Sequence, residues 1–482
     1  MSKLSTMRQQ ISSNQEELKN FFRHGENSCL PGSWLPKYGK SALALPNDPS
    51  VSQWSSEARS APACLDSMSK SSTLFPLDQM GSKMNLSYLS EHSELAPIWQ
   101  PRLENGDEAY LLRHFQRHLA DWLDAGNTKR QFSTDVARRA TQSPLLLYAC
   151  IAAAACHLSR TAYTVSPDLA NQFYERCISI ILAALHKPVF DIEIDILLSS
   201  TVILRLFEQI SSNTPSNDPQ CHLLAGSVYF SSYVDYAISG GLSSASFWIF
   251  VVQDIQSALS HQKRLKLDFE LFDGRLRRLW ASKPVLSDGD WVNRAIWLLA
   301  ETINSYFDVP RRNFSHGLDF SGEVTLKQRI GEWELEVSKA IRPLHISPPD
   351  PAKGNPFPVI WYNNIAHSTA MQHVCLAKAL MLIQEYAIQH SMLSPEKQLH
   401  LKEEIWYNLD YLFGIALSAD DEPSLRVMAC HALYACSAWI DNRIARNSLF
   451  NLLRQTEREN GWPWAYVEQQ VLHTWQGDSR EE

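Results

Sequence analysis

The sequence predicts an all-α protein, and three observations support this fold class. Apolar residues recur at intervals of three and four along most of the chain, which is the spacing of one helix face. Strand-like alternation is nearly absent. Glycine is scarce, with 18 residues in 482, whereas the average share is about 7% and turn-rich β folds need glycine. We therefore expect one large multi-helix domain preceded by an irregular N-terminal segment.

Residues 1–25 carry a short heptad pattern. Five apolar residues and one asparagine alternate at the spacings of coiled-coil a and d positions: Leu4, Met7, Ile11, Asn14, Leu18 and Phe21. This pattern predicts an amphipathic helix whose seam is a candidate contact for a homodimer or a partner. Three heptads are few for a coiled coil, so a surface helix docked on the protein's own body is the main alternative.

Residues 26–95 have a different composition, rich in Ser and Pro with short apolar islands such as CLDSM (64–68) and LFPLDQM (74–80). This composition favours a linker over an acidic and hydrophobic activation-like segment. The helical domain is expected over residues 96–476. It is not expected to cross a membrane, because its longest apolar runs fall short of the roughly 20 residues that a membrane helix needs.

Helix starts are marked at three places near the beginning of this domain. Asn105 with Glu108 has the spacing of a capping box, and Ser143 and Ser166 each stand before a proline that suits a first helical turn. The helix that follows Ser143 reads LLLYACIAAAACHL and is apolar nearly all round, so we place it at the centre of the core. Periodicity predicts further helices over 191–210, 219–238, 244–260, 290–307, 325–342, 358–390, 400–418, 424–441 and 463–475.

Linear motifs for cofactors and catalysis are missing from the sequence. Neither GxGxxG nor GxxxxGK[ST] occurs, and HExxH and GxSxG are absent too. The nearest acidic motif, Asp420-Asp421-Glu422, stands beside a proline and is better explained as the start of a helix. We therefore expect no cofactor and no enzyme activity, with an enzyme recruited on this scaffold as the alternative.

Two groups of cysteines and histidines could suggest a metal site: His367, His373 and Cys375, and Cys430, His431 and Cys436. Structural zinc usually takes four ligands, commonly CxxC or a closely spaced His pair, and neither group has that spacing. Both groups fall on apolar predicted helices. We therefore expect core thiols and hydrogen-bonded histidines, and no metal.

The charge pattern does not favour nucleic acid. The chain has 44 Lys and Arg against 52 Asp and Glu, a net charge of −8, which repels a polyphosphate. Basic residues gather at 263–266 and 275–278, where a nuclear-import address or a phosphate contact is one interpretation. Asp268, Glu270 and Asp273 are interleaved with them, so a solvated surface of mixed charge is favoured.

Several of these segments, in order, resemble the fungal-specific transcription-factor domain, the helical middle region of zinc-cluster regulators. The resemblance is carried by EAYLLRHFQRHLADWLD (108–124), RRATQSPLLLYACIAAAACHLSR (138–160), VILRLFEQI (202–210), SGGLSSASFWIFVVQDI (239–255), DWVNRAIW (290–297), FPVIWY (357–362), FGIALSADDEPSLRVMACHALYACSAWI (413–440) and LLRQTERENGWPWA (452–465). It implies an all-α fold, a nuclear location and a role in regulating transcription. Many members control gene clusters for secondary metabolites or nutrient use.

One feature of that family is missing before residue 96. Members carry six closely spaced cysteines that hold two zinc ions and set a helix for the major groove, whereas this segment contains Cys29 and Cys64 alone. We therefore expect no sequence-specific DNA binding by the chain itself. A regulator would act through a DNA-binding or transcription-machinery partner, or by sensing a small molecule in a cavity between helices. A truncated paralogue that acts only as an interaction protein is the remaining alternative.

Overall fold

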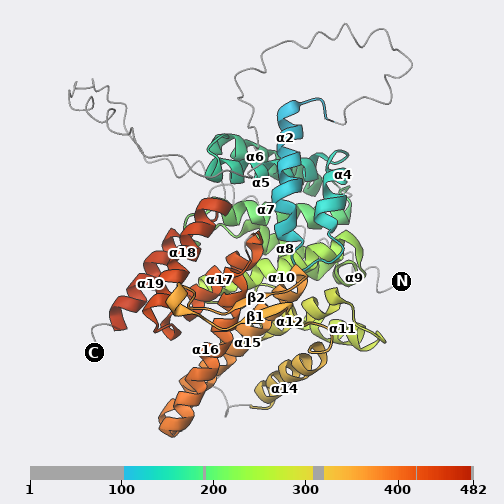
Figure 1. The fold of residues 1–482 in the computed structure, drawn as a ribbon. Helices are drawn as coiled ribbons and strands as arrows, with labels where there is room; N and C mark the ends of the chain where they lie inside the picture. The colour runs from blue at the N-terminus through green and yellow to red at the C-terminus, as the bar shows by residue number, and fades with distance from the viewer. Residues whose placement is uncertain (1–102, 188–190, 308–319, 420, 479–482) are drawn as a thin grey trace, which may run out of the picture. The chain divides into compact units, whose positions relative to one another are not determined.

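The structure, a computed structural model, describes residues 103–187, 191–307, 320–419 and 421–478 (Figure 1). Within these residues the architecture is helical apart from one two-stranded hairpin, which confirms the predicted all-α class. The heptad residues Leu4, Met7, Ile11, Asn14, Leu18 and Phe21 lie outside the described residues, as does the linker 26–95. Both of those assignments stay predictions.

The first helices form where the capping residues predicted them. α2 (Gly106–His114) begins after Asn105, whose side chain accepts a hydrogen bond from the Asp107 amide at 2.9 Å. A π-helical turn (Phe115–Leu119) leads into α3 (Ala120–Leu123), and a second π-helical turn (Phe132–Val136) precedes α4 (Ala137–Ala140). Phe115 and Leu119 are fully buried, as the predicted apolar face requires.

α5 (Pro144–Thr161) is the central helix that its apolar sequence predicted, with α6 (Pro167–Leu185) and α7 (Ile194–Ser211) packed against it. It is long and apolar enough to cross a membrane by composition, and among the described helices it alone passes that test. However, 78% of it is buried inside the protein. Burial on all sides by other helices is typical of a core helix.

The middle of the domain consists of α8 (Cys221–Ser232), α9 (Val234–Ile238) and α10 (Gly241–His261). The single helix predicted over 219–238 is wrong at Tyr233, where the backbone (φ −121°, ψ 43°) breaks it into α8 and α9. Gly240 and Gly241 both have positive φ, 97° and 73°, which permits the abrupt turn into α10.

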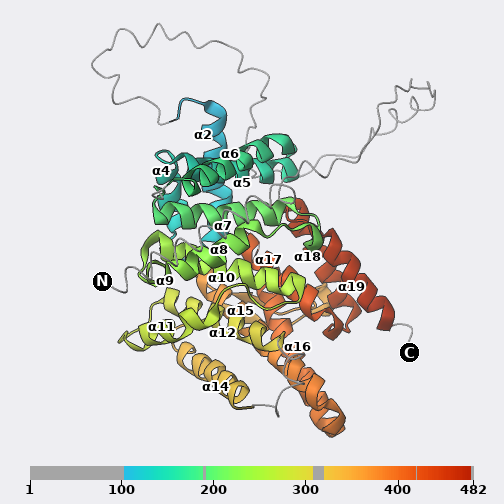
Figure 2. The same cartoon turned by 180° about the vertical axis from the view of Figure 1, so that it is seen from behind.

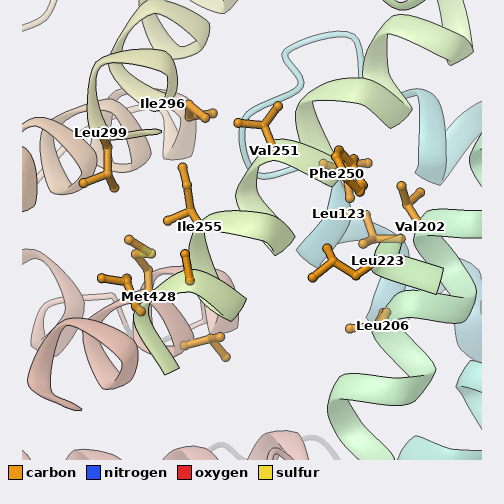
Figure 3. Packing of buried hydrophobic residues seen from close by; sticks show 14 of the residues in the cluster. Leu123, Val202, Leu206, Leu223, Phe250, Val251, Ile255, Ile296, Leu299 and Met428 are labelled. Atoms are coloured by element: carbon orange, nitrogen blue, oxygen red, sulfur yellow. The ribbon is translucent and has the colours of Figure 1, made fainter. Parts of the chain in front are cut away.

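Opposite sides of α10 pack on different neighbours. Phe250 lies beside Val202 of α7, and Val251 lies toward Ile296 of α12 (Asp288–Tyr306) (Figure 3). All of these side chains belong to one continuous hydrophobic core. α11 (Phe269–Ala281) and α14 (Phe320–Val337) complete this part of the chain.

The C-terminal third contains α15 (Ile365–Gln389), α16 (Pro395–Leu417), α17 (Pro423–Cys436), α18 (Arg443–Asn460) and α19 (Ala465–Asp478). α18 and α19 lie side by side in both views (Figure 1, Figure 2). The acidic motif directly precedes α17, with Glu422 at its N-cap, so its assignment to a helix start is confirmed.

Three further elements differ from the prediction. The helix expected over 358–390 begins only at Ile365, because β2 (Val359–Trp361) pairs antiparallel with β1 (His345–Ser347). α11 and α18 were not predicted as helices at all. Both helices carry many polar residues and bury only a narrow stripe of apolar side chains, such as Leu449, Leu452 and Leu453 in α18. A prediction based on long apolar segments therefore misses them.

Candidate functional site

A cavity of about 450 Å³ lies among α3, α7, α10, α11, α12, α15 and α17. Its volume falls in the range of roughly 300–1,000 Å³ that small-molecule sites occupy. Residues far apart in sequence meet at it, from Trp122 after the first π-helical turn to Trp462 between α18 and α19. The cavity is therefore a product of the whole helical assembly rather than of one motif.

One face of α10 runs along the cavity. The residues that line it recur at intervals of three and one over four turns: Gly241, Ser244, Ala245, Trp248, Ile249, Val252, Gln253 and Gln256. Three of them, Ser244, Trp248 and Val252, are half-buried, whereas the rest of the helix interior is fully buried. The small residues at the start of α10 leave space, and the amides near its end add polarity.

The wall is mainly aromatic and aliphatic. Trp248 and Trp280 lie with ring centroids 6.2 Å apart, and Trp122 and Trp462 form a second pair at 6.4 Å. Aliphatic side chains and a methionine also line the cavity, and Figure 3 labels four of these residues, Leu123, Leu206, Ile296 and Met428. Such a wall favours a ligand with a large apolar ring system.

Two buried glutamines of the wall hold their amide groups in a defined orientation. Gln253 donates from Nε2 to the Val202 carbonyl at 2.9 Å. Gln372 donates from Nε2 to two carbonyls, those of Leu412 at 3.3 Å and Leu425 at 3.2 Å. Because these carbonyls can only accept, each amide must present its N–H groups there. Among the described residues, neither Oε1 atom has a hydrogen-bond donor.

His373 contributes a third acceptor. Its Nδ1 lies 2.7 Å from the Thr369 carbonyl and must donate to it, so in the neutral ring Nε2 carries a lone pair. Burial lowers the pKa of His373 to about 4, although the hydrogen bond to Thr369 opposes that shift. The ring is therefore neutral at physiological pH. No described residue donates to its Nε2.

A pair of amides completes the polar part of the wall. Gln209 of α7 donates from Nε2 to Gln256 Oε1 of α10 at 2.9 Å, which leaves Gln209 Oε1 without a donor in the described part of the chain. Ser424 Oγ, at the start of α17, likewise has no hydrogen-bond partner among the described residues. Buried acceptors without donors are costly. They belong to residues that border the cavity, but the acceptor atoms themselves are covered by protein.

The charged groups of the wall are engaged with one another or exposed. Lys283 donates to Asp290 at 2.5 Å, and Asp290 also accepts from the Ser287 hydroxyl at 2.7 Å in a capping box. The pKa of Asp290 lies below its usual value, because the bonds to Lys283 and Ser287 outweigh the opposing effect of burial. Lys129, at the rim, is exposed. Most of the polar side chains in the cavity lining are therefore uncharged.

A second hollow of about 820 Å³ is larger but less suited to a ligand. Its charged side chains pair with each other: Arg277 with Glu301 at 3.3 Å, and Arg294 with Glu336 at 3.0 Å. These pairs are partly exposed, as is usual for a surface of mixed charge. We take the apolar cavity with its four tryptophans as the candidate site.

The cysteine and histidine groups lie in the core, as predicted. His367 contacts Asp288 at 3.2 Å, His431 bonds Ser260 at 3.0 Å, and Cys375, Cys430 and Cys436 are buried free thiols. Among the described residues, no group of three or more His, Cys, Asp or Glu side chains could hold a metal ion. His373 is the one member of these groups with a place in the candidate site.

The basic segments have structural partners. The Asp254 carboxylate accepts from the amides of Lys266 at 3.0 Å and Leu267 at 2.8 Å, which anchors the 263–266 segment. In the second segment, Arg275 pairs with Asp235 at 2.5 Å and Arg277 with Asp273 at 2.8 Å. The structure therefore supports the surface of mixed charge rather than a phosphate-binding patch.

Sequence reasoning did not find this cavity. A signal was present in α10, where small residues and glutamines share one helix face with Trp248. Its spacing predicts only a helix, because spacing alone cannot tell whether a helix face meets side chains or a void.

Comparison with known proteins gives one result. No curated protein and no solved structure matches the chain. A family match covers residues 110–291, from α2 to the first turns of α12, and includes α7 and α10 of the cavity wall. It agrees with the resemblance that the sequence carries. Residues 110–291 of this chain form a fungal specific transcription factor domain.

Proposed function

We propose that this chain is a nuclear regulator of transcription whose activity depends on a small molecule held in the central cavity. The domain at 110–291 is that of fungal transcription factors, which supports the regulatory role. The observation that carries the ligand dependence is the position of the cavity, since α7 and α10 of that domain form much of its wall. A ligand there would bias the packing of helices contributed by distant parts of the chain.

In this proposal a partner protein binds the DNA and recruits the chain to it. Residues 1–95 contain Cys29 and Cys64, too few thiolates for the zinc cluster of this family. The net charge of −8 also opposes nonspecific attraction to DNA. The partner is a DNA-binding or transcription-machinery protein, and the heptad seam at Leu4–Phe21 is the proposed contact for that partner or for a second copy of the chain.

The decisive experiment is chromatin occupancy of the tagged full chain in its host, with co-purified proteins identified from the same cells. We expect nuclear enrichment, occupancy at a limited set of promoters and a co-purified DNA-binding protein. The targets expected from the family are gene clusters for secondary metabolism or nutrient use. A chain that is excluded from the nucleus would contradict the proposal.

A gel-shift assay tests the need for a partner. The purified chain should form no complex with the occupied promoter fragments that survives competitor DNA and moderate salt. Addition of the co-purified partner should produce one. A salt-resistant complex formed by the chain alone would show that it reads DNA directly.

The enzyme alternative finds little support in the cavity. General acid–base catalysis requires titratable groups that converge on one site and are free to exchange a proton with the substrate. In the described wall, His373 is neutral and hydrogen-bonded, and Lys283 and Asp290 neutralise each other. These groups favour binding over proton transfer.

A further inference from the structure

We propose that the cavity binds an aromatic monocarboxylate, with its rings among the tryptophans and its carboxylate at the end where α10 and α12 begin. This inference rests on the proposed function for the ligand's role in regulation and adds the ligand's chemical class. Three observations carry it: the aromatic lining, a set of accessible polar side chains at that end, and one lysine without an ion-pair partner.

The cavity extends along α10. Its lining residues on this helix lie within 241–256, which is about 22 Å of helix axis at 1.5 Å per residue. α12 runs beside α10 in the same direction. The rings of Trp248 and Trp297 lie 6.1 Å apart, and further along the two helices Asp254 and Asn304 accept hydrogen bonds, both of 3.0 Å, from adjacent amides of one loop. The two helices therefore begin at the same end of the cavity.

Two accessible polar side chains come from these helix starts. Ser244 of α10 and Asn293 of α12 line the cavity one turn before Trp248 and Trp297. Both are half-buried, and neither side chain has a hydrogen-bond partner among the described residues. Their polar atoms are not among those covered by protein, in contrast to the acceptors of the buried glutamines. A ligand in the cavity can therefore reach them.

The loop at 124–131 adds three polar side chains to the same end. Thr128, Lys129 and Gln131 belong to the cavity lining. The loop packs on the start of α12, because a Cβ added at Gly289 would lie 3.2 Å from Thr128 Oγ1. The three side chains are exposed or half-buried and make no hydrogen bond to a described residue. Hydroxyl, amide and ammonium groups can all donate, so this end can satisfy the oxygens of a carboxylate.

Lys129 makes this end positive. The other charged groups of the lining, Lys283 and Asp290, bind each other at 2.5 Å, whereas Lys129 makes no ion pair with a described residue. The remaining charges of its loop are also engaged: Asp124 is buried and accepts from two backbone amides, and Arg130 pairs with an aspartate of α3. A carboxylate would therefore gain a charge-assisted hydrogen bond, whereas an ammonium group would meet a cation.

The rest of the lining sets the carbon skeleton. Trp248 lies one turn beyond Ser244, with its ring 6.2 Å from that of Trp280. Trp462 lies toward the other end of α10, since it and Gln256 border the same small hollow. Rings spaced along the cavity favour stacked or edge-on contact with the rings of a ligand. Because the apolar lining begins one turn from the polar end, a carboxylate attached directly to an aromatic ring fits both.

The test compares three matched biphenyl compounds on the full chain: the carboxylate, the carboxamide and the aminomethyl compound, which is a cation. The same three forms on naphthalene guard against a poor fit of one skeleton. Binding is measured by calorimetry and by quenching of tryptophan fluorescence. We expect the carboxylate to bind at least about tenfold more tightly than the amide, and the amine to bind most weakly. Because Lys129 is exposed, added salt should weaken binding of the carboxylate and leave that of the amide unchanged.

Two variants assign the effect to this cavity. Lys129→Gln should weaken carboxylate binding about tenfold and leave amide binding within about twofold, which also shows that the variant is folded. Lys397→Gln is the matched control, because Lys397 is an equally exposed lysine on α16 outside the cavity lining. It should change neither compound. Ala245→Phe places a ring in the cavity and leaves Lys129 intact, so it should weaken both compounds at least about tenfold.

Four outcomes would overturn the inference: an amide or amine that binds as tightly as the carboxylate, full carboxylate affinity in Lys129→Gln, full affinity for both compounds in Ala245→Phe, or no binding of either carboxylate. Failure of this inference is separable from failure of the proposed function. Promoter occupancy without carboxylate binding would reject the ligand class alone. Carboxylate binding by a chain excluded from the nucleus would reject the regulatory role alone.

Discussion

α5 and α10 are both long apolar helices inside the same core, yet their surroundings differ. From Leu145 to Leu158, α5 is buried on every side except at Tyr148, and His157 is its one buried polar side chain. α10 buries a much larger polar set, comprising Ser243, Ser246, Gln253, Asp254, Gln256, Ser257 and Ser260, and one of its faces meets a cavity. Apolar content alone therefore predicts that a helix is buried, but not what it is buried against.

The difference has a physical reason. Alanines in the middle of α5 allow close approach of neighbouring helices, so the space around it is filled. On α10 the small residues Gly241, Ser244 and Ala245 line the cavity, and a Cβ added at Gly241 would meet nothing within 4 Å. Close packing stabilises the surroundings of α5. The surroundings of α10 are less closely packed and contain unpaired hydrogen-bond acceptors, and binding sites commonly show such a loss of stability.

The largest expected effect tests this contrast directly. Ala153→Phe in α5 would force a ring into a fully packed position and should lower the free energy of unfolding by about 3 kcal/mol or prevent folding. Ala245→Phe in α10 can extend into the cavity and should cost less than about 1 kcal/mol. Thermal and urea unfolding of both variants measures the difference. Equal losses would mean that the cavity is not available to side chains.

The packed face of α10 gives a smaller effect. A Cβ added at Gly226 would lie 2.6 Å from the Phe250 ring, which is itself fixed against Phe230 at a centroid distance of 5.0 Å. Gly226→Ala should therefore destabilise the protein by about 2 kcal/mol. Ser244→Ala, on the cavity face, is the control and should change stability by less than about 0.5 kcal/mol. An undisturbed melting temperature for Gly226→Ala would contradict the tight packing assigned to this face.

The smallest expected effect concerns pH. Burial lowers the pKa of His373 to about 4 from its ordinary value of 6.5, so below pH 6.5 this histidine is protonated in the unfolded chain but stays neutral in the folded chain. Stability is therefore complete above pH 6.5, falls as the pH drops toward 4 and levels off below it. At pH 5.5 the loss from this residue is about 1 kcal/mol.

His373→Phe isolates this contribution. The variant should show a flatter decline of stability between pH 7 and 5 than the parent, measured by urea unfolding at each pH. Burial, together with the nearby His114 and His118, lowers the pKa of His157 of α5 to about 3, so this residue remains in the variant as one source of a residual slope. An unchanged slope would mean that His373 is protonated in the folded state.

Much of the fold could be predicted from residue patterns. The caps at Asn105 and Ser166 act as expected, since both side chains accept from the amides of the following turn. The predicted core helix is α5. α11 and α18 escaped prediction because each buries only a narrow stripe, and the β1–β2 hairpin escaped because a strand of three residues, Val359–Trp361, has too few positions for a visible alternation.

The sequence by itself determined the all-α class, the central position of α5 and the family that residues 110–291 match. These properties depend on local spacing and residue type. Only the tertiary structure decided that one face of α10 meets a cavity and that Gln253, Gln372 and His373 share its wall. The physical reason is that a void, and an acceptor without a donor, are properties of neighbours, and here the neighbours come from segments more than 300 residues apart, Trp122 and Trp462 among them.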